Sequence, residues 1–132
     1  MIADCILDTS AVVAFLRLEP GAEHVRERLN ASRCLMHAVN VAEICFTVPR
    51  RMPERFTPEL AMAWFIAANI AVSDILAPDF LQMTAKIRLA ERSLSIGDGM
   101  AIALASVLKL PVLTTERNFK KAHQYTAIEL IR

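Results

Sequence analysis

Short apolar runs alternate with longer segments of helical spacing along the whole chain. Five runs are apolar at nearly every position, a pattern that is typical of strands buried on both faces of a sheet. The expected strands are 2–7, 33–38, 70–76, 111–115 and 126–131. Apolar residues three or four positions apart predict helices between these strands. The expected helices are 10–17, 21–30, 57–68, 77–92 and 98–109, with a further one that begins at Val39.

Strands that alternate with helices indicate a parallel sheet covered on both faces. The expected fold class is therefore α/β: a three-layer α/β/α sandwich around a mainly parallel five-stranded sheet. No repeat, low-complexity tract or linker divides the sequence, which predicts a single domain over residues 1–132. Right-handed crossovers bring the carboxyl ends of the strands to one edge of such a sheet, where ligands bind.

Prolines mark two of the predicted helix boundaries. The helix that begins at Val39 is expected to end at Pro49 and Pro53, because proline lacks a backbone N–H and clashes inside a helix. Thr57 is a candidate N-cap that stands directly before a proline. The longest apolar run, 60–72, is expected to form a buried helix that leads into a strand.

The composition excludes several classes of protein. Hydrophobic residues make up 55% of the chain and the mean hydropathy is +0.37, an excess that suggests apolar surface for a protein partner or a second copy. No apolar run reaches the roughly 18 residues of a membrane span, and the N-terminal "MIADCIL" lacks the basic segment of a signal peptide. Cys5, Cys34 and Cys45 stand singly, which argues against a disulfide framework or zinc site. A cytoplasmic protein is expected.

Four acids fall where this topology gathers the strand ends. Asp8 follows the first strand, Glu43 lies about one turn into the helix after the second, and Glu116 comes just past the fourth. Asp98 caps or begins the helix that precedes the fourth strand. These acids are expected to lie together at the carboxyl edge of the sheet and are the candidate catalytic residues. Asp4 is excluded, because it lies about 13 Å from Asp8 along the strand, at the opposite end.

Clustered carboxylates repel one another unless a cation compensates them. No lysine or arginine stands close in the sequence to Asp8 or Asp98, and oxygen ligands suit Mg²⁺, or Mn²⁺, better than Zn²⁺. Mg²⁺ takes only one or two protein carboxylates directly. Asp8 and Asp98 are therefore the predicted metal ligands, and the other two acids are expected to act through water. Such a site hydrolyses a phosphodiester by in-line displacement.

The formal net charge of +1 excludes a polycation, so nucleic-acid binding depends on local basic patches. Two stretches, "PRRMPERF" and "ERNFKKA", gather basic residues. The candidates for contact with an RNA backbone are Arg50, Arg51, Arg117 and Lys120.

Other enzyme classes lack their local motifs, since no GxSxG, P-loop or GxGxxG occurs. The three histidines fit no nucleophilic scheme, and His37 is expected to be a core or surface residue. A receiver-like phosphotransfer domain is one alternative, but Asp74 falls inside the third predicted strand and no lysine follows the last one. A non-catalytic module whose acids bind a basic peptide is the other alternative.

The ordered motifs resemble the PIN-domain nucleases, and within them the small VapC-type toxins of type II toxin–antitoxin systems. The resemblance rests on "ILDTSAVVAFL", "NVAEI" and "GDGMAIALASVLKLPVLTTERNF", and it covers nearly the whole chain in the expected order. It implies a metal-dependent endoribonuclease, often directed against structured RNA such as tRNA or rRNA. It also implies a homodimer that is neutralised by a small antitoxin protein made from the adjacent gene. A PIN-like nuclease outside a toxin–antitoxin system is the alternative.

By this resemblance Asp8, Glu43 and Asp98 would be the three core acids. The residues that would support the site are Thr9, Ser10, Thr114 and Asn118. Glu116 falls where the family commonly has an aspartate, and Asn118 falls where a second acid often follows. The longer glutamate and the neutral asparagine leave open whether one or two cations bind.

Overall fold

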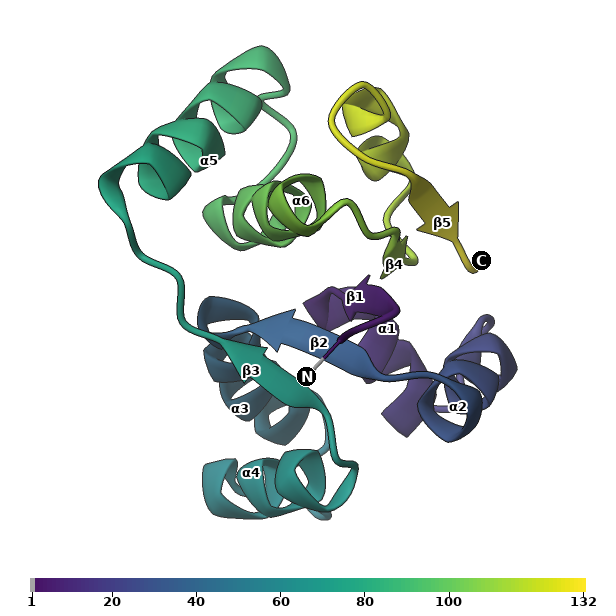
Figure 1. The fold of residues 1–132 in the computed structure, drawn as a ribbon. Helices are drawn as coiled ribbons and strands as arrows, with labels where there is room; N and C mark the ends of the chain where they lie inside the picture. The colour runs from purple at the N-terminus through teal and green to yellow at the C-terminus, as the bar shows by residue number, and fades with distance from the viewer. Residues whose placement is uncertain (1) are drawn as a thin grey trace.

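A five-stranded parallel sheet forms the middle layer of the computed structural model, which describes residues 2–132 (Figure 1). The strands are β1 (Cys5–Leu7), β2 (Cys34–His37), β3 (Ala71–Ser73), β4 (Val112–Thr114) and β5 (Ile128–Leu130). Their order in the sheet is β3-β2-β1-β4-β5, and every neighbouring pair is parallel. The carboxyl ends of all five strands therefore lie at one edge, with β1 in the centre.

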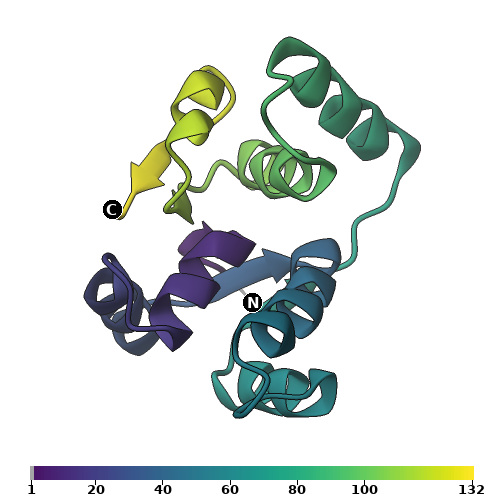
Figure 2. The ribbon, with the colours of Figure 1, turned by 180° about the vertical axis from the view of Figure 1, so that it is seen from behind.

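Helices cover both faces of the sheet, so the predicted three-layer sandwich is confirmed. They are α1 (Thr9–Leu16), α2 (Ala22–Ala31), α3 (Ala38–Arg51), α4 (Pro58–Ala67), α5 (Pro78–Ala90) and α6 (Ile96–Leu108), followed by the 3₁₀ helix η1 (Arg117–Ala122). The first four lie on one face, and α5, α6 and η1 lie on the other (Figure 1). Figure 2 shows α1 and α3 side by side on their face of the sheet, and the two helices are in contact.

Alternate strand residues feed two separate cores, because successive side chains of a strand point to opposite faces. Cys5 and Leu7 of β1 pack with α1 to α4, whereas Ile6 packs with α5 and α6. The alanines of α6 are fully buried and allow this helix to lie close to the sheet. Cys5 also faces Cys34 on the neighbouring strand, with their sulfur atoms 3.5 Å apart, and both are free thiols.

Each strand is shorter than the apolar run that predicted it. The run 2–7 pairs only from Cys5 onwards, and Ile2 is 81% exposed. In the third run pairing stops at Ser73, so Asp74 follows β3 and does not lie inside a strand as predicted. The reason is that a residue can be apolar without taking part in the sheet. An apolar run therefore extends past the segment that pairs with a neighbouring strand.

Two helix predictions are wrong in informative ways. Pro49 does not end α3, which continues to Arg51, two residues before Pro53. The proline stands in the last turn, where a missing N–H disrupts little of the remaining helix, and Met52 N still donates to the carbonyl oxygen of Val48 at 2.8 Å.

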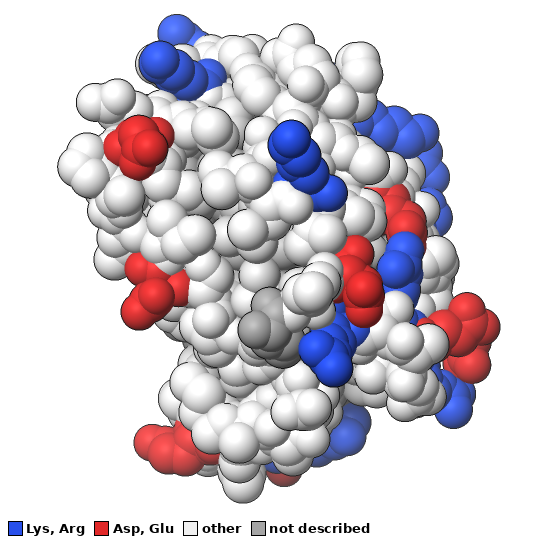
Figure 3. Space-filling view, viewed as in Figure 1, with Lys and Arg blue, Asp and Glu red and all other residues white. Residues whose placement is uncertain are grey.

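The apolar run 60–72 is not a buried helix, because α4 packs mainly on α3 and lies away from the sheet (Figure 1). It buries Ala61 and Phe65, whereas Leu60 and Ile66 are 53% and 69% exposed. Figure 3 shows that charged side chains are few over the left and middle of the face seen in Figure 1 and gather along its right side. Among residues 2–132, no helix has both the length and the apolar character to span a membrane.

Candidate active site

Asp8 stands between the end of β1 and the start of α1, and its side chain is almost completely buried, at 2% exposed. It is the N-cap of α1, where its Oδ1 accepts a hydrogen bond from Ala11 N at 2.9 Å. Ser10 Oγ donates to the same carboxylate at 2.8 Å, and Thr114 Oγ1 at the end of β4 donates to Oδ2 at 2.7 Å. Asp8 therefore caps α1 with Oδ1, and its second oxygen joins β1 to β4 through Thr114.

Burial raises the pKa of Asp8 from its ordinary value of 3.8 to about 7, against the opposing effect of the hydrogen bonds from Thr114, Ala11 and Ser10. The negative charge of Asp98 raises the pKa further. At neutral pH the carboxyl group is therefore poised between its two protonation states, and a nearby cation would hold it ionised.

Glu43 lies one turn into α3, and three groups hold its carboxylate. Thr9 Oγ1 donates to Oε1 at 2.6 Å, and Asn40 Nδ2 donates to the same oxygen at 2.9 Å. The backbone of Gly97 supplies the third boundary, because a Cβ atom there would lie 2.5 Å from each carboxylate oxygen. Asn40 is buried and also donates to the carbonyl oxygen of Gly97 at 3.1 Å, so it joins α3 to the first turn of α6.

Asp98 is the third residue of α6, not its first residue or cap as the sequence predicts. The helix begins earlier, at Ile96, with Ser95 as its N-cap. Ser95 Oγ accepts from Asp98 N at 3.1 Å, and the Asp98 carboxylate accepts from Ser95 N at 2.9 Å, which completes a capping box. Burial raises the pKa of Asp98 against these hydrogen bonds, and the charge of Glu43 raises it further.

A cleft of about 490 Å³ opens above these acids at the carboxyl edge of the sheet. Its walls include Glu43 and Asp98, with Ser10 beside the buried Asp8. Glu116 is exposed at the wall directly after β4, where its backbone N donates to Thr114 Oγ1 at 2.9 Å. Residues of α1, α3, α6 and the segment after β4 therefore meet at one place.

The chain matches the family model described as "PIN domain" over residues 5–124. It belongs to the PIN domain family. The search of curated protein sequences gave no match.

Solved structures share the fold of this PIN domain at low sequence identity. A DNA-bound VapBC from Salmonella typhimurium is 22% identical with a TM-score of 0.68, and the match covers 96% of each chain. VapBC2 from Rickettsia felis, bound to a DNA fragment from its promoter, is 12% identical with a TM-score of 0.68 and covers 95% of this chain and 96% of its own. FitAcB from Neisseria gonorrhoeae is 22% identical with a TM-score of 0.62, covering 95% and 96%.

The supporting residues of the PIN domain differ in how they serve the site. Thr9 holds Glu43, whereas Ser10 and Thr114 hold Asp8. Asn118 lines the cleft, donates from Nδ2 to the carbonyl oxygen of Ser93 at 3.1 Å, and leaves its Oδ1 without a partner among the described residues.

Only one of the four predicted backbone-binding residues lines the cleft, namely Arg51. Arg50 points elsewhere and stacks over the Phe46 ring, with its guanidinium carbon 5.3 Å from the ring centroid. Arg117 and Lys120 belong to η1 and do not line the cleft. Neighbouring residues of a helix point about 100° apart, which separates Arg50 from Arg51.

The site residues that sequence reasoning missed include Asn40, Glu19 and Arg132. Asn40 had a usable signal, because a residue three positions before Glu43 on the same helix lies beside it. Glu19 and Arg132 had none, since they reach the cleft from a turn and from the last residue of the chain.

Two sequence-based expectations about other residues are resolved by the same geometry. His37 is a core residue, fully buried, whose Nδ1 accepts from Val39 N and whose Nε2 lies 2.9 Å from the carbonyl oxygen of Ile75. Asp74 is exposed after the edge strand β3, which β2 separates from β1. The sequence argues against a receiver-like domain because it predicts Asp74 inside a strand; the structure places Asp74 after β3 instead, and it is the strand order that separates it from Asp8.

The donor set of the site fits a hard divalent cation. Within the described part of the chain, none of the four acids forms an ion pair with lysine or arginine. The charge of a second carboxylate raises the pKa of both Asp8 and Asp98. No three Asp, Glu, His or Cys side chains among residues 2–132 are arranged closely enough to hold a metal between them. Mg²⁺ takes only one or two carboxylates directly and keeps its waters, so two acids of this set, such as Asp8 and Asp98, would be enough to hold it.

Replacement of Asp8 by asparagine is expected to remove a pH dependence of stability. Because the pKa in the folded protein lies above 3.8, the folded state binds the proton more tightly than the unfolded chain. The stabilisation is complete below about pH 4 and is lost as the pH rises through about 7. In EDTA, the free energy of urea unfolding should therefore fall between pH 4 and 8 by up to about 4 kcal/mol more in the wild type than in Asp8→Asn. Identical pH profiles would contradict the burial of an ionisable Asp8.

Gly97→Ala is expected to dislodge Glu43, because the new Cβ would lie 2.5 Å from both carboxylate oxygens. Mg²⁺ binding measured by calorimetry should weaken at least about tenfold, which corresponds to ~1.4 kcal/mol. Gly99→Ala is the matched control in the same helix, since its Cβ would meet only Thr84, at 3.2 Å or more. Equal Mg²⁺ affinities for the two variants would show that the Glu43 position does not matter to the metal.

Proposed function

We propose that this PIN domain is a Mg²⁺-dependent endoribonuclease that acts as the toxin of a toxin–antitoxin pair. The observation that supports this proposal most strongly is a pair of carboxylates at one cleft: Asp8, which is buried beside it, and Asp98, which is half-buried at its wall. Both carry raised pKa values through burial, and neither has a cationic partner among the described side chains. A site of this kind is unfavourable by itself and becomes favourable when a hard cation binds.

The residues of the chain would divide the work of phosphodiester hydrolysis. Mg²⁺, or Mn²⁺, would be held by Asp8 and Asp98, and when bound it supplies positive charge against the scissile phosphate and activates water. Glu43 is fixed by Thr9 and Asn40 at the same wall, where it can orient that water and accept its proton. Glu116 is the fourth acid, exposed at the wall of the same cleft, and would contribute further negative charge.

The toxin part of the proposal rests on the structural relatives and on the exposed apolar surface. The relatives with this fold include a toxin–antitoxin complex from Klebsiella pneumoniae, with 14% identity and a TM-score of 0.68. Leu60 and Ile66 on α4 expose apolar area of the kind that protein partners cover. We therefore propose a cytoplasmic homodimer neutralised by a cognate antitoxin protein, with structured RNA such as tRNA or rRNA as substrate.

Asp8→Asn and Asp98→Asn are each expected to abolish Mg²⁺-dependent RNA cleavage, with activity reduced at least about a thousandfold, since each removes a charge and not volume. Asp74→Asn is the matched control, because Asp74 is an exposed aspartate that follows the edge strand of the same sheet. Cleavage should be followed on gels with purified RNA, with and without EDTA. The products should carry 5′-phosphate and 3′-hydroxyl ends, because water is the nucleophile.

Three outcomes would count against the proposal. If Asp8→Asn cleaved RNA as fast as the wild type, the carboxylate of Asp8 would have no role in the reaction. Products with 2′,3′-cyclic phosphate ends would exclude water as the nucleophile. Tight binding of a basic peptide without Mg²⁺, together with no cleavage at any pH, would favour the non-catalytic module. Cleavage that the product of the adjacent gene does not inhibit would place the protein outside a toxin–antitoxin system.

A further inference from the structure

Arg51 lines the cleft at the acids. This residue, the last of α3, also lines a second hollow of about 280 Å³ on its other side. The second hollow contains three arginines, Arg17, Arg51 and Arg55, together with one acid, Glu54. An acidic cleft and a mainly basic hollow therefore adjoin at Arg51.

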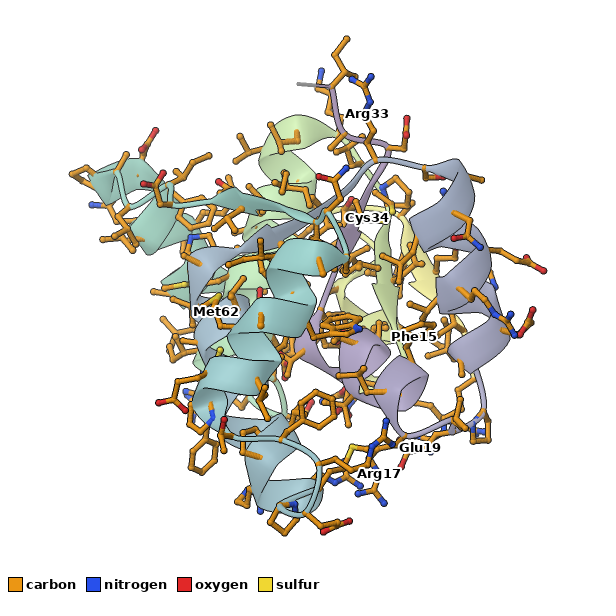
Figure 4. The ribbon with its side chains drawn as sticks, turned by 90° about the horizontal axis from the view of Figure 1, so that it is seen from below. Phe15, Arg17, Glu19, Arg33, Cys34 and Met62 are labelled. Carbon is orange, nitrogen blue, oxygen red and sulfur yellow. The ribbon has the colours of Figure 1, made fainter. Side chains whose placement is uncertain are left out.

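Arg17 and Arg51 are held in place by a shared carboxylate, that of Glu19. Arg17 Nε donates to Glu19 Oε2 at 3.0 Å, and Arg51 Nη2 lies 3.6 Å from the same oxygen. Arg17 Nη1 also lies 3.4 Å from the backbone carbonyl oxygen of Arg51, which ties the turn after α1 to the end of α3. Figure 4 shows Arg17 and Glu19 together beyond the end of α1.

Among residues 2–132, these contacts leave most of the N–H donors of Arg17 and Arg51 without a partner. Each guanidinium has five N–H groups, and the contacts with Glu19 and the Arg51 carbonyl use at most two on either residue. The group of Arg17, Glu19 and Arg51 carries a net charge of +1. Because the contacts with Glu19 already position both guanidinium groups, an incoming phosphate meets oriented donors at small cost in side-chain entropy.

An exposed leucine stands beside these arginines. Leu18 lines the same hollow, is 84% exposed, and has a backbone φ of 55° in the left-handed region. A leucine in this conformation is uncommon and costs free energy, and full exposure adds a second unfavourable feature. An apolar side chain among arginines offers a surface on which a flat base can lie.

We propose that an RNA strand bound at the acids runs across Arg51, with the next phosphates seated on Arg17, Arg51 and Arg55 and a base against Leu18. The inference rests on the proposed function and deepens it, because it names unpaired RNA as the form of substrate at this site. The two halves of the groove have separate tasks. The acids hold the cation at the scissile phosphate, and the arginines bind the neighbouring phosphates that the acids would repel.

The test measures binding without cleavage. The full chain carrying Asp8→Asn is titrated in EDTA against a labelled oligouridylate by fluorescence anisotropy, at several salt concentrations. Arg17→Ala/Arg51→Ala is expected to lower the affinity at least about tenfold and to reduce the slope of log K against log salt by about 1.4, or 0.7 for each lost phosphate contact. Lys86→Ala/Arg88→Ala removes the same charge from exposed positions of α5 and should change neither the affinity nor the slope by a comparable amount.

Two further variants guard against misfolding as an explanation. Glu19→Gln removes the competing carboxylate and should tighten RNA binding, a result that a damaged protein cannot give. Asparagine suits the left-handed backbone better than leucine, so Leu18→Asn should lower the affinity while leaving the salt slope unchanged and without lowering the thermal stability.

Failure of this inference differs from failure of the proposed function. If wild-type protein cleaves RNA with Mg²⁺ but the double arginine variant binds RNA with unchanged affinity and slope, the inference is wrong and the function stands. If the double variant instead loses only its binding to the antitoxin made from the adjacent gene, the hollow is a protein-docking surface and the inference is again overturned. If the wild type binds RNA with the expected slope but never cleaves it, the proposed function is wrong, and the assignment of the arginines to RNA binding stands.

Discussion

One constraint shapes the whole site: the carboxyl group of Asp8 is buried at the centre of the sheet without a cationic partner among the described residues. Its burial is costly, and no arginine or lysine of the described chain offsets it. What keeps it in place is a set of neutral donors, Ala11 N and the hydroxyl groups of Ser10 and Thr114. The last of these comes from β4, so the acid that destabilises the centre of the sheet also fastens two of its strands.

The other two acids are positioned by interactions that also build the fold. Asp98 closes the capping box of α6, and Glu43 fills the space that Gly97 leaves open. Asn40 connects α3 to the first turn of α6, since it donates to the Glu43 carboxylate and to the Gly97 carbonyl. The distance between the acids of α3 and α6 is thereby set by helix packing and buried hydrogen bonds. Such a site is rigid before any ligand arrives, which is what binding a small cation requires.

The sequence predicted the sheet and the convergence of the acids because both follow from connectivity. Apolar strands separated by helices admit few topologies, and right-handed crossovers place Asp8, Glu43 and Glu116 at one edge. Features set by packing could not be obtained in this way. The exposure of α4 depends on its place outside α3, and the different directions of Arg50 and Arg51 depend on how α3 lies on the sheet.

The net charge of +1 conceals a separation of charge along one groove. Acids occupy the end over β1 and β4, and arginines occupy the end beyond α3. Charges closer than a Debye length, about 8 Å in physiological salt, act on a ligand as a local field and not as a sum over the molecule. A polyanion without a cation is repelled at one end and attracted at the other, so it has one favourable placement. If the proposed function is right, a divalent cation at the acidic end would let the same strand occupy the whole groove, and substrate position would then be coupled to metal occupancy.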